Sequence, residues 1–102
     1  MIVMVDIDDT ICEGDTYETA TPIRKNIEKI NQLYMEGHEV IYWTARGTLK
    51  EGNWFHITYE QLMDWGCLFH ELRMNKPVFD IFIDDKVINS QHYFGVMEGE
   101  WS

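Results

Sequence analysis

The sequence predicts one small α/β domain over residues 1–102, with a small and mainly parallel sheet. Three observations lead to this prediction. Short apolar segments alternate with a clearly amphipathic helical segment, as in strand–helix–strand units. The first two apolar segments are far enough apart for a crossover helix, which joins parallel strands with right-handed geometry. Polar residues, several of them acidic, directly follow three of the apolar segments.

The first half of the chain has the order strand, loop, helix and strand, predicted over residues 2–7, 8–21, 22–36 and 38–44. Both strand segments are short, apolar and rich in β-branched residues, which is typical of buried strands. Thr21 and Pro22 are residue types favoured at a helix N-cap and at the first helical position. Gly37 lies where a glycine is favoured just beyond a helix.

The second half has the order loop, helix, third strand, fourth strand and tail, predicted over residues 45–53, 54–65, 67–72, 78–85 and 86–102. Gly47 and Gly52 favour a loop over residues 45–53, and Gly66 is expected to end the helix. In the fourth strand, Phe79, Ile81 and Ile83 alternate with other residues, at the period of a strand. The tail is expected to contain a short helix and a weakly structured end.

The composition restricts the classes of function. The chain has 18 acidic and 8 basic residues and a formal net charge of −10. An acidic surface repels phosphate backbones, which disfavours nucleic-acid binding without excluding it. No apolar run approaches the ~20 residues of a membrane span, and the N-terminus does not resemble a secretory signal, so we expect no membrane contact. Cys12 and Cys67 fit reduced thiols in a cytoplasmic protein.

Side chains with reactive groups follow three predicted strands: Asp6 and Asp8 the first, Thr44 the second, and Asp84 and Asp85 the fourth. Ligands of open α/β sheets bind outside the carboxyl ends of the strands, so these side chains are expected at one edge. Converging carboxylates repel one another unless some are protonated or a cation lies between them. Oxygen ligands favour Mg²⁺, so the sequence predicts a magnesium site.

Two basic residues complete the predicted site. Lys76 precedes the fourth strand and could supply fixed positive charge for an anionic substrate. Arg46 lies two residues beyond Thr44, and its guanidinium could bind a phosphate or a sugar carboxylate. A surface salt bridge is a comparable interpretation of Arg46. A carboxylate nucleophile, Mg²⁺, a lysine and a threonine hydroxyl together are typical of phosphoryl transfer.

Four short segments resemble, in order, the motifs of the haloacid dehalogenase superfamily: DIDDT, VIYWT, NKP and FIDD. The resemblance covers residues 1 to about 90. It implies a three-layer Rossmann-like fold, and this chain would have no cap domain because residues 12–21 and 47–74 leave no room for one. The surroundings YWTARG and IDDK are also similar to small phosphatases associated with bacterial capsule biosynthesis.

The resemblance assigns a role to each matching position. Asp6 would attack phosphorus and form an aspartyl-phosphate, and Asp8 would be the general acid and base. Residues i and i+2 of an extended chain point to the same side, which suits this pair. Thr44 would hydrogen-bond a phosphoryl oxygen. Lys76 would hold Asp6 and neutralise the phosphate.

The resemblance also implies the cofactor and the substrate. Mg²⁺ would be held by Asp6, by the backbone carbonyl of Asp8, and by Asp84 and Asp85, with the direct ligand of this last pair left open. A sugar phosphate is the first expectation for the substrate. A polynucleotide 3′-phosphate or a phosphoprotein are the alternatives. The open pocket and minimal sheet also fit a homo-oligomer.

Two non-enzymatic functions are weighed against this interpretation. A signalling receiver domain also uses an acidic pair, a Thr and a Lys, but its phosphoacceptor Asp ends the third strand. Here the third predicted strand offers only Glu71. A silent binding domain would be indicated by loss of Asp6 or Asp8, and both are present. The sequence therefore favours a phosphatase.

Overall fold

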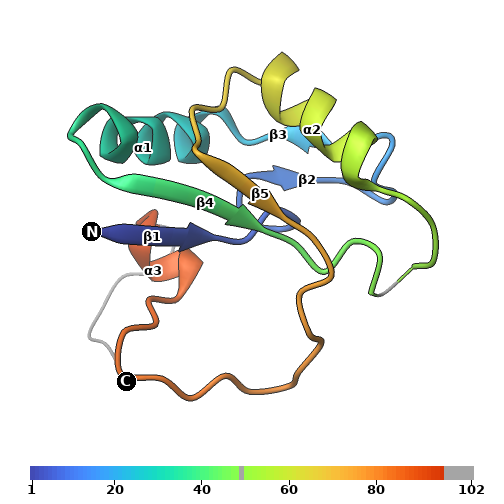
Figure 1. Ribbon diagram of the computed structural model, residues 1–102. Helices are drawn as coiled ribbons and strands as arrows, with labels where there is room; N and C mark the ends of the chain where they lie inside the picture. Colours follow the sequence, from blue (N-terminus) through green and yellow to red (C-terminus); the bar gives the residue numbers. More distant parts are fainter. Residues whose placement is uncertain (49, 96–102) are drawn as a thin grey trace.

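The computed structural model describes residues 1–48 and 50–95, and within them the chain forms a three-stranded parallel sheet (Figure 1). The strands are β1 (Ile2–Val5), β4 (Glu39–Trp43) and β5 (Glu71–Arg73), in the spatial order β1-β4-β5. The predicted α/β class with a mainly parallel sheet is therefore confirmed.

Two helices lie on one face of this sheet. The connection from β1 to β4 contains α1 (Arg24–Met35), and the connection from β4 to β5 contains α2 (Phe55–Asp64). Both connections step along the sheet in the same direction, so right-handed crossovers place both helices on the same face. The short α3 (Ser90–Tyr93) contacts α1 through the Lys29 ammonium, 4.1 Å from the centre of the Tyr93 ring. Among the described residues, no helix has the length and apolar character needed to cross a membrane.

The hydrophobic core lies between the sheet and these helices. Val40 and Tyr42 of β4 pack there with Ile27 of α1 and Leu62 of α2, and all four are fully buried. Strand residues alternate between the two faces of a sheet, so Ile2 and Met4 of β1 point away from this core. Residues 2 and 4 are 67% and 43% exposed.

A small hairpin replaces part of the loop predicted over residues 8–21. It consists of β2 (Cys12–Glu13) and β3 (Thr21–Pro22), which pair in antiparallel fashion. The Thr21 hydroxyl donates to the carbonyl of Glu13, so this residue serves the hairpin and does not cap a helix. The prediction that the helix starts at residue 22 was wrong, because an edge strand accepts Pro as readily as a first helical turn does.

The third strand is shorter and begins later than the predicted 67–72. Gly66 adopts φ of +74°, and the Cys67 N–H donates to the carbonyl of Leu62. This turn ends α2. It includes Cys67, which was predicted to start the third strand. Pairing with β4 therefore begins at Glu71.

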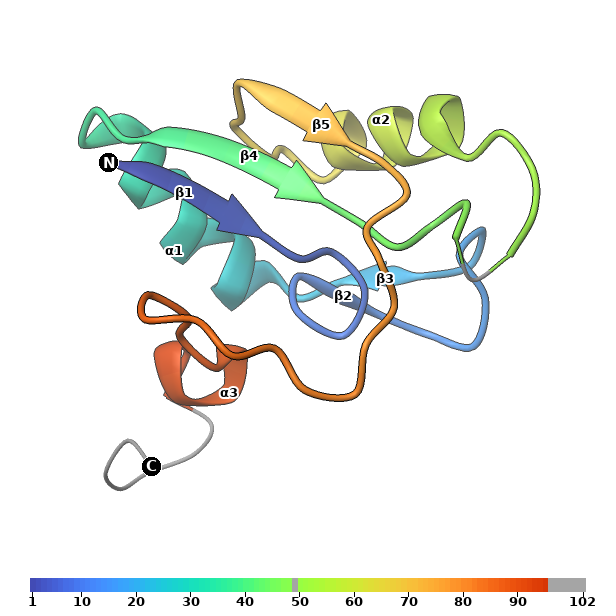
Figure 2. The same cartoon turned by 60° about the horizontal axis from the view of Figure 1, so that its bottom comes forward.

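The fourth predicted strand, residues 78–85, is not part of a sheet in this structure. The chain leaves β5 and follows a wide loop to α3 (Figures 1 and 2). Ile81 and Ile83 are 77% and 92% exposed, so their alternation does not produce burial here. A strand needs a pairing partner as well as an alternating pattern, and the pattern alone does not specify one. The predicted weakly structured end falls on residues 96–102, outside the described residues.

The packing of α2 gives a direct test of the fold. Leu62→Ala removes a fully buried side chain and is expected to lower the free energy of unfolding by about 2–5 kcal/mol. Met63→Ala, at the exposed neighbouring position, is the matched control and should change it by less than about 0.5 kcal/mol. Urea unfolding measures both, and equal effects would show that α2 packs by a different face.

Candidate active site

The ends of all three strands meet at one edge of the sheet. In the pairing of β1 with β4, Val5 lies opposite Tyr42, so Asp6 and Thr44 each come just after adjacent strands. The Thr44 N–H donates to the carbonyl of Arg73 at the end of β5. The Lys76 N–H in turn donates to the carbonyl of Thr44. Parallel pairing therefore gathers these residues as the sequence pattern predicts.

The loop after β1 directs its carboxylates outward. Ile7 is fully buried, whereas Asp6 and Asp8 on either side of it are partly exposed. The carbonyl of Ile7 accepts from the N–H groups of Thr10 and Ile11, and this tightens the loop. Asp9 has φ of +61°, a conformation that Asp tolerates in turns.

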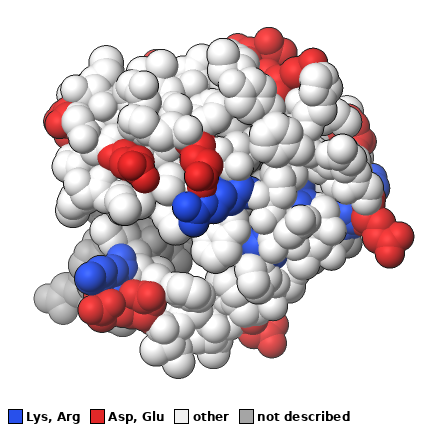
Figure 3. Space-filling view, in the orientation of Figure 1, with Lys and Arg blue, Asp and Glu red and all other residues white. Residues whose placement is uncertain are grey.

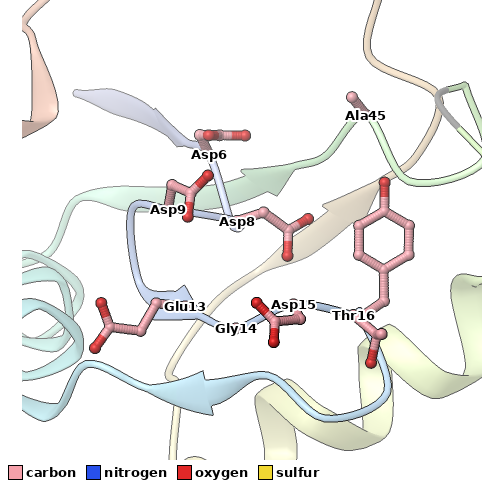
Figure 4. Close-up of a pocket in the computed structure, with 9 residues that line it drawn as sticks. Asp6, Asp8, Asp9, Glu13, Gly14, Asp15, Thr16 and Ala45 are labelled. Atoms are coloured by element: carbon pink, nitrogen blue, oxygen red, sulfur yellow. The ribbon is translucent and has the colours of Figure 1, made fainter.

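These carboxylates face a cavity of about 300 Å³ between this loop, the hairpin region and the loop after β4 (Figure 4). Its lining residues are Asp6, Asp8, Asp9, Glu13, Gly14, Asp15, Thr16, Tyr17 and Ala45. Five of these nine carry carboxylates, so the cavity is strongly acidic. On the face of the molecule in Figure 3, acidic and basic side chains lie beside one another near the centre.

Asp6 has two side-chain partners, Thr10 and Lys76. The Thr10 hydroxyl donates to its Oδ2 over 3.2 Å, and the Lys76 Nζ lies 3.8 Å from its Oδ1. Burial raises the pKa of Asp6 above its ordinary value, and the attraction of Lys76 opposes this rise only in part. The Lys76 ammonium also lies 5.7 Å from the centre of the Trp43 ring. The lysine is thus positioned beside the predicted nucleophile.

Asp8 is held by Arg46. The Arg46 Nε donates to Oδ2 of Asp8 over 3.1 Å, and Nη2 donates to Oδ1 over 2.9 Å. The Nη1 of Arg46 donates to Thr58 and Gln61 of α2, over 3.1 and 2.6 Å. Arg46 is 0% exposed, so its guanidinium lies behind Asp8 and does not face the cavity. The predicted contact of Arg46 with a phosphate or a sugar carboxylate is therefore not available in this arrangement.

Thr44 is also enclosed. It is fully buried, and its hydroxyl accepts a hydrogen bond from the Arg46 N–H over 3.1 Å. The neighbouring Ala45, and not Thr44, lines the cavity. The predicted contact of the Thr44 hydroxyl with a phosphoryl oxygen is therefore not available in this arrangement.

Asp84 and Asp85 do not join Asp6 and Asp8 at the cavity. Both are exposed in the loop after β5, and neither lines the cavity. The Asp84 carboxylate accepts from the Lys86 N–H over 2.8 Å. Asp6 and Asp8 have the oxygen donors that Mg²⁺ favours, but within residues 1–48 and 50–95 no three His, Cys, Asp or Glu side chains are grouped to hold a metal ion. The predicted four-carboxylate magnesium site is not assembled in this structure.

Cys12 lies beside the site, and its thiol donates a hydrogen bond to Asp8. Its Sγ is 3.6 Å from Oδ1 of Asp8. Burial, with a further contribution from the Asp8 charge, raises the pKa of the thiol to about 12. Because the thiolate is the reactive form, this cysteine is not an activated nucleophile.

Sequence reasoning missed three residues that support the site. Thr10 is the last residue of the DIDDT segment, so the motif itself carried the signal for its contact with Asp6. Thr58 and Gln61 are three residues apart on α2 and therefore share a helix face. Polar residues on a helix are normally solvated, so nothing in the sequence marked this pair as partners of a buried arginine.

Comparison with known proteins supports the fold only. The chain is similar to an MCSG target from Vibrio cholerae whose crystal structure has been determined, with a TM-score of 0.79 and 24% sequence identity. The match covers 95% of this chain and 89% of that chain. No family model matches the chain, and no curated protein does.

The environment of Asp6 predicts a gain of stability when its charge is removed. Its raised pKa means that the folded state binds the proton more tightly than the unfolded state, so ionisation destabilises the fold as the pH rises from about 3.8. Asp6→Asn is expected to raise Tm at pH 7 by on the order of 2 °C. This gain should shrink toward zero as the pH falls below the ordinary value of 3.8.

Thermal unfolding followed by circular dichroism between pH 3 and 8 would measure this dependence. The exposed Glu28→Gln in α1 is the control, with no comparable gain expected. A lower Tm for Asp6→Asn at pH 7 would contradict the assigned environment.

Proposed function

We propose that this protein is a phosphomonoester hydrolase of the haloacid dehalogenase type that forms an aspartyl-phosphate on Asp6. One observation carries the proposal. Asp6 and Asp8 follow β1 at the rim of an open cavity, with the Lys76 ammonium 3.8 Å from Asp6 and the Arg46 guanidinium 2.9 Å from Asp8. This arrangement offers a nucleophilic carboxylate, an acid–base carboxylate and a cation for an anionic substrate.

The reaction proceeds in two displacements at phosphorus. A carboxylate oxygen of Asp6 attacks the phosphoryl group, the bond to the leaving oxygen breaks, and protonated Asp8 supplies the proton to that oxygen. A water molecule then attacks the aspartyl-phosphate and gives its proton to the Asp8 carboxylate. The bond between phosphorus and Asp6 breaks, which releases inorganic phosphate and restores the Asp6 carboxylate.

A sugar phosphate is the substrate class we favour. The five carboxylates of the cavity repel a polyanion, whereas a neutral sugar brings only the charge of its single phosphate. A polynucleotide would need a basic surface, and Arg46 cannot contribute because it is buried. The exposed Arg73 is paired with Glu71. A phosphoprotein remains the second alternative.

The magnesium site requires a rearrangement of the loop after β5. The eight residue-to-residue steps from Lys76 to Asp84 can extend about 26–29 Å, enough for the chain to leave the site and return. We propose that Asp84 or Asp85 joins Asp6 and the backbone carbonyl of Asp8 in this way. Mg²⁺ held there would neutralise charge on the phosphoryl group and the carboxylates.

We also propose that this protein has the three-layer Rossmann-like fold of this superfamily. In a three-layer Rossmann-like fold without a cap domain, both faces of the sheet are covered. On the second face Ile2 and Met4 are exposed, although Ile41, which is paired with Met4, is buried. Ile81 and Ile83 are exposed in the loop after β5. We propose that residues 78–89 cover this face when the site is complete, because both apolar surfaces then leave water.

The catalytic assignment is tested by substitution at the two carboxylates. Asp6→Asn is expected to reduce phosphate release by at least about a thousandfold, because an amide is not a competent nucleophile at phosphorus. Asp8→Asn should accumulate aspartyl-phosphate with p-nitrophenyl phosphate, whose leaving group needs no proton. A screen of sugar phosphates, nucleotides and 3′-phosphorylated oligonucleotides with Mg²⁺ supplies the substrates.

Glu28→Gln, on the exposed surface of α1, is the control and should retain full activity. Equal residual activity in the wild type and in Asp6→Asn would remove the nucleophile assignment. Normal turnover by Asp8→Asn would remove the acid–base assignment.

Metal binding is tested without relying on turnover. Mg²⁺ that binds only the folded state should raise Tm by an amount that grows with its concentration. Asp84→Asn or Asp85→Asn should abolish this rise, and Asp80→Asn, an exposed carboxylate of the same segment, should keep it. Hydrogen exchange of residues 78–85 should slow when Mg²⁺ is added. Full activity in EDTA, with no effect of Mg²⁺ on Tm, would contradict the proposed metal site.

A further inference from the structure

We infer that Arg46 is a positioning residue that holds Asp8 for the second displacement, the hydrolysis of the aspartyl-phosphate. The inference rests on the proposed function and adds a residue that acts through Asp8 without contact to the substrate. It replaces the expectation that Arg46 binds substrate directly.

The first support is the geometry of the Arg46–Asp8 pair. Nε and Nη2 of Arg46 each donate to a different oxygen of Asp8, over 3.1 and 2.9 Å. Two parallel hydrogen bonds fix both the position and the plane of the carboxylate. The Arg46 side chain is 0% exposed and that of Asp8 is 34% exposed, so Asp8 is held from behind and is open toward the cavity.

The second support is the way in which Arg46 itself is held. Its Nη1 donates to the Thr58 hydroxyl and to the Gln61 Oε1 on α2. Its guanidinium carbon lies 4.8 Å from the centre of the Tyr17 ring. The Gln61 Nε2 donates to the backbone carbonyl of Tyr17 over 2.6 Å. Arg46 therefore connects the loop after β1, the cavity wall at residue 17 and α2, and its rotamer is not free to change.

The third support is the direction of the hydrogen bonds. A guanidinium has only donors, so both Asp8 oxygens accept from Arg46. Oδ1 also accepts from the Cys12 thiol over 3.6 Å, whereas Oδ2 accepts from Arg46 Nε and has a further lone pair for a proton from water. The carboxylate is the form required when water attacks the aspartyl-phosphate. The observed geometry thus fits the base role of Asp8 in the second displacement.

Arg46→Lys tests the inference, because lysine keeps the charge but cannot form the two parallel hydrogen bonds. With p-nitrophenyl phosphate and Mg²⁺, rapid-quench measurements separate the formation of phosphoenzyme from its hydrolysis. We expect the hydrolysis rate to fall about 10- to 100-fold, and the burst of p-nitrophenol to change less than about threefold. The fraction of enzyme carrying acid-stable phosphate should therefore rise in the steady state.

Three further variants complete the design. Gln61→Met removes an acceptor of Arg46 while leaving the pair with Asp8, so it should give the same pattern with a smaller effect, and it serves if Arg46→Lys does not fold. Arg73→Lys changes an exposed arginine and should leave both rates unchanged. Adding Arg46→Lys to Asp8→Asn should slow hydrolysis no further, because the two residues act as one unit.

The outcomes distinguish the two levels of the proposal. If wild-type protein forms phosphoenzyme and Arg46→Lys lowers its formation and its hydrolysis equally, or lowers neither, the positioning role of Arg46 is overturned. If the wild type forms no phosphoenzyme and releases no phosphate, the phosphatase function itself fails, and the role of Arg46 fails with it.

Discussion

The arrangement of the site depends on one partly buried interaction, the paired hydrogen bonds between Arg46 and Asp8. Burying a guanidinium is costly unless its donors find acceptors, and Arg46 uses them on Asp8 and on two residues of α2. Three separate parts of the chain must therefore come together: the loop after β1, the loop after β4, and α2. Parallel pairing of β1 with β4 brings the two loops to the same edge of the sheet. The helix α2 supplies the remaining acceptors for the Arg46 guanidinium.

The charges at this edge suit phosphate chemistry only in part. Lys76 and Arg46 provide fixed positive charge next to Asp6 and Asp8, while Asp9, Glu13 and Asp15 add negative charge around the cavity. A phosphoryl group that enters this cavity meets more negative than positive charge. A divalent cation would reverse that balance, which is the physical reason to retain Mg²⁺ in the proposed function.

The sequence predicts local structure better than it predicts long-range pairing. Apolar periodicity located β1, β4 and both longer helices, because burial on one face imposes a period that single residues reveal. It did not reveal that Pro22 would join a hairpin, since proline suits both an edge strand and a helix start. It also assigned a strand to residues 78–85, where the alternating pattern is present but no partner strand is paired.

In the candidate site, too, the sequence predicts the order of the elements better than it predicts side-chain contacts between them. Asp6 and Lys76 come together because they follow β1 and β5, whose carboxyl ends lie at the same edge of the parallel sheet on either side of β4. The role of Arg46 could not be predicted, because it depends on which way one side chain turns at the end of β4.

The measurement that tests the central claim most directly is identification of the phosphorylated residue. Protein mixed with substrate is quenched and reduced with borohydride, which converts an aspartyl-phosphate to homoserine, and its peptides are analysed by mass spectrometry. We predict homoserine at position 6 only when substrate is present. Homoserine at another acidic position, or release of phosphate with none at position 6, would contradict the assignment of Asp6 as the nucleophile.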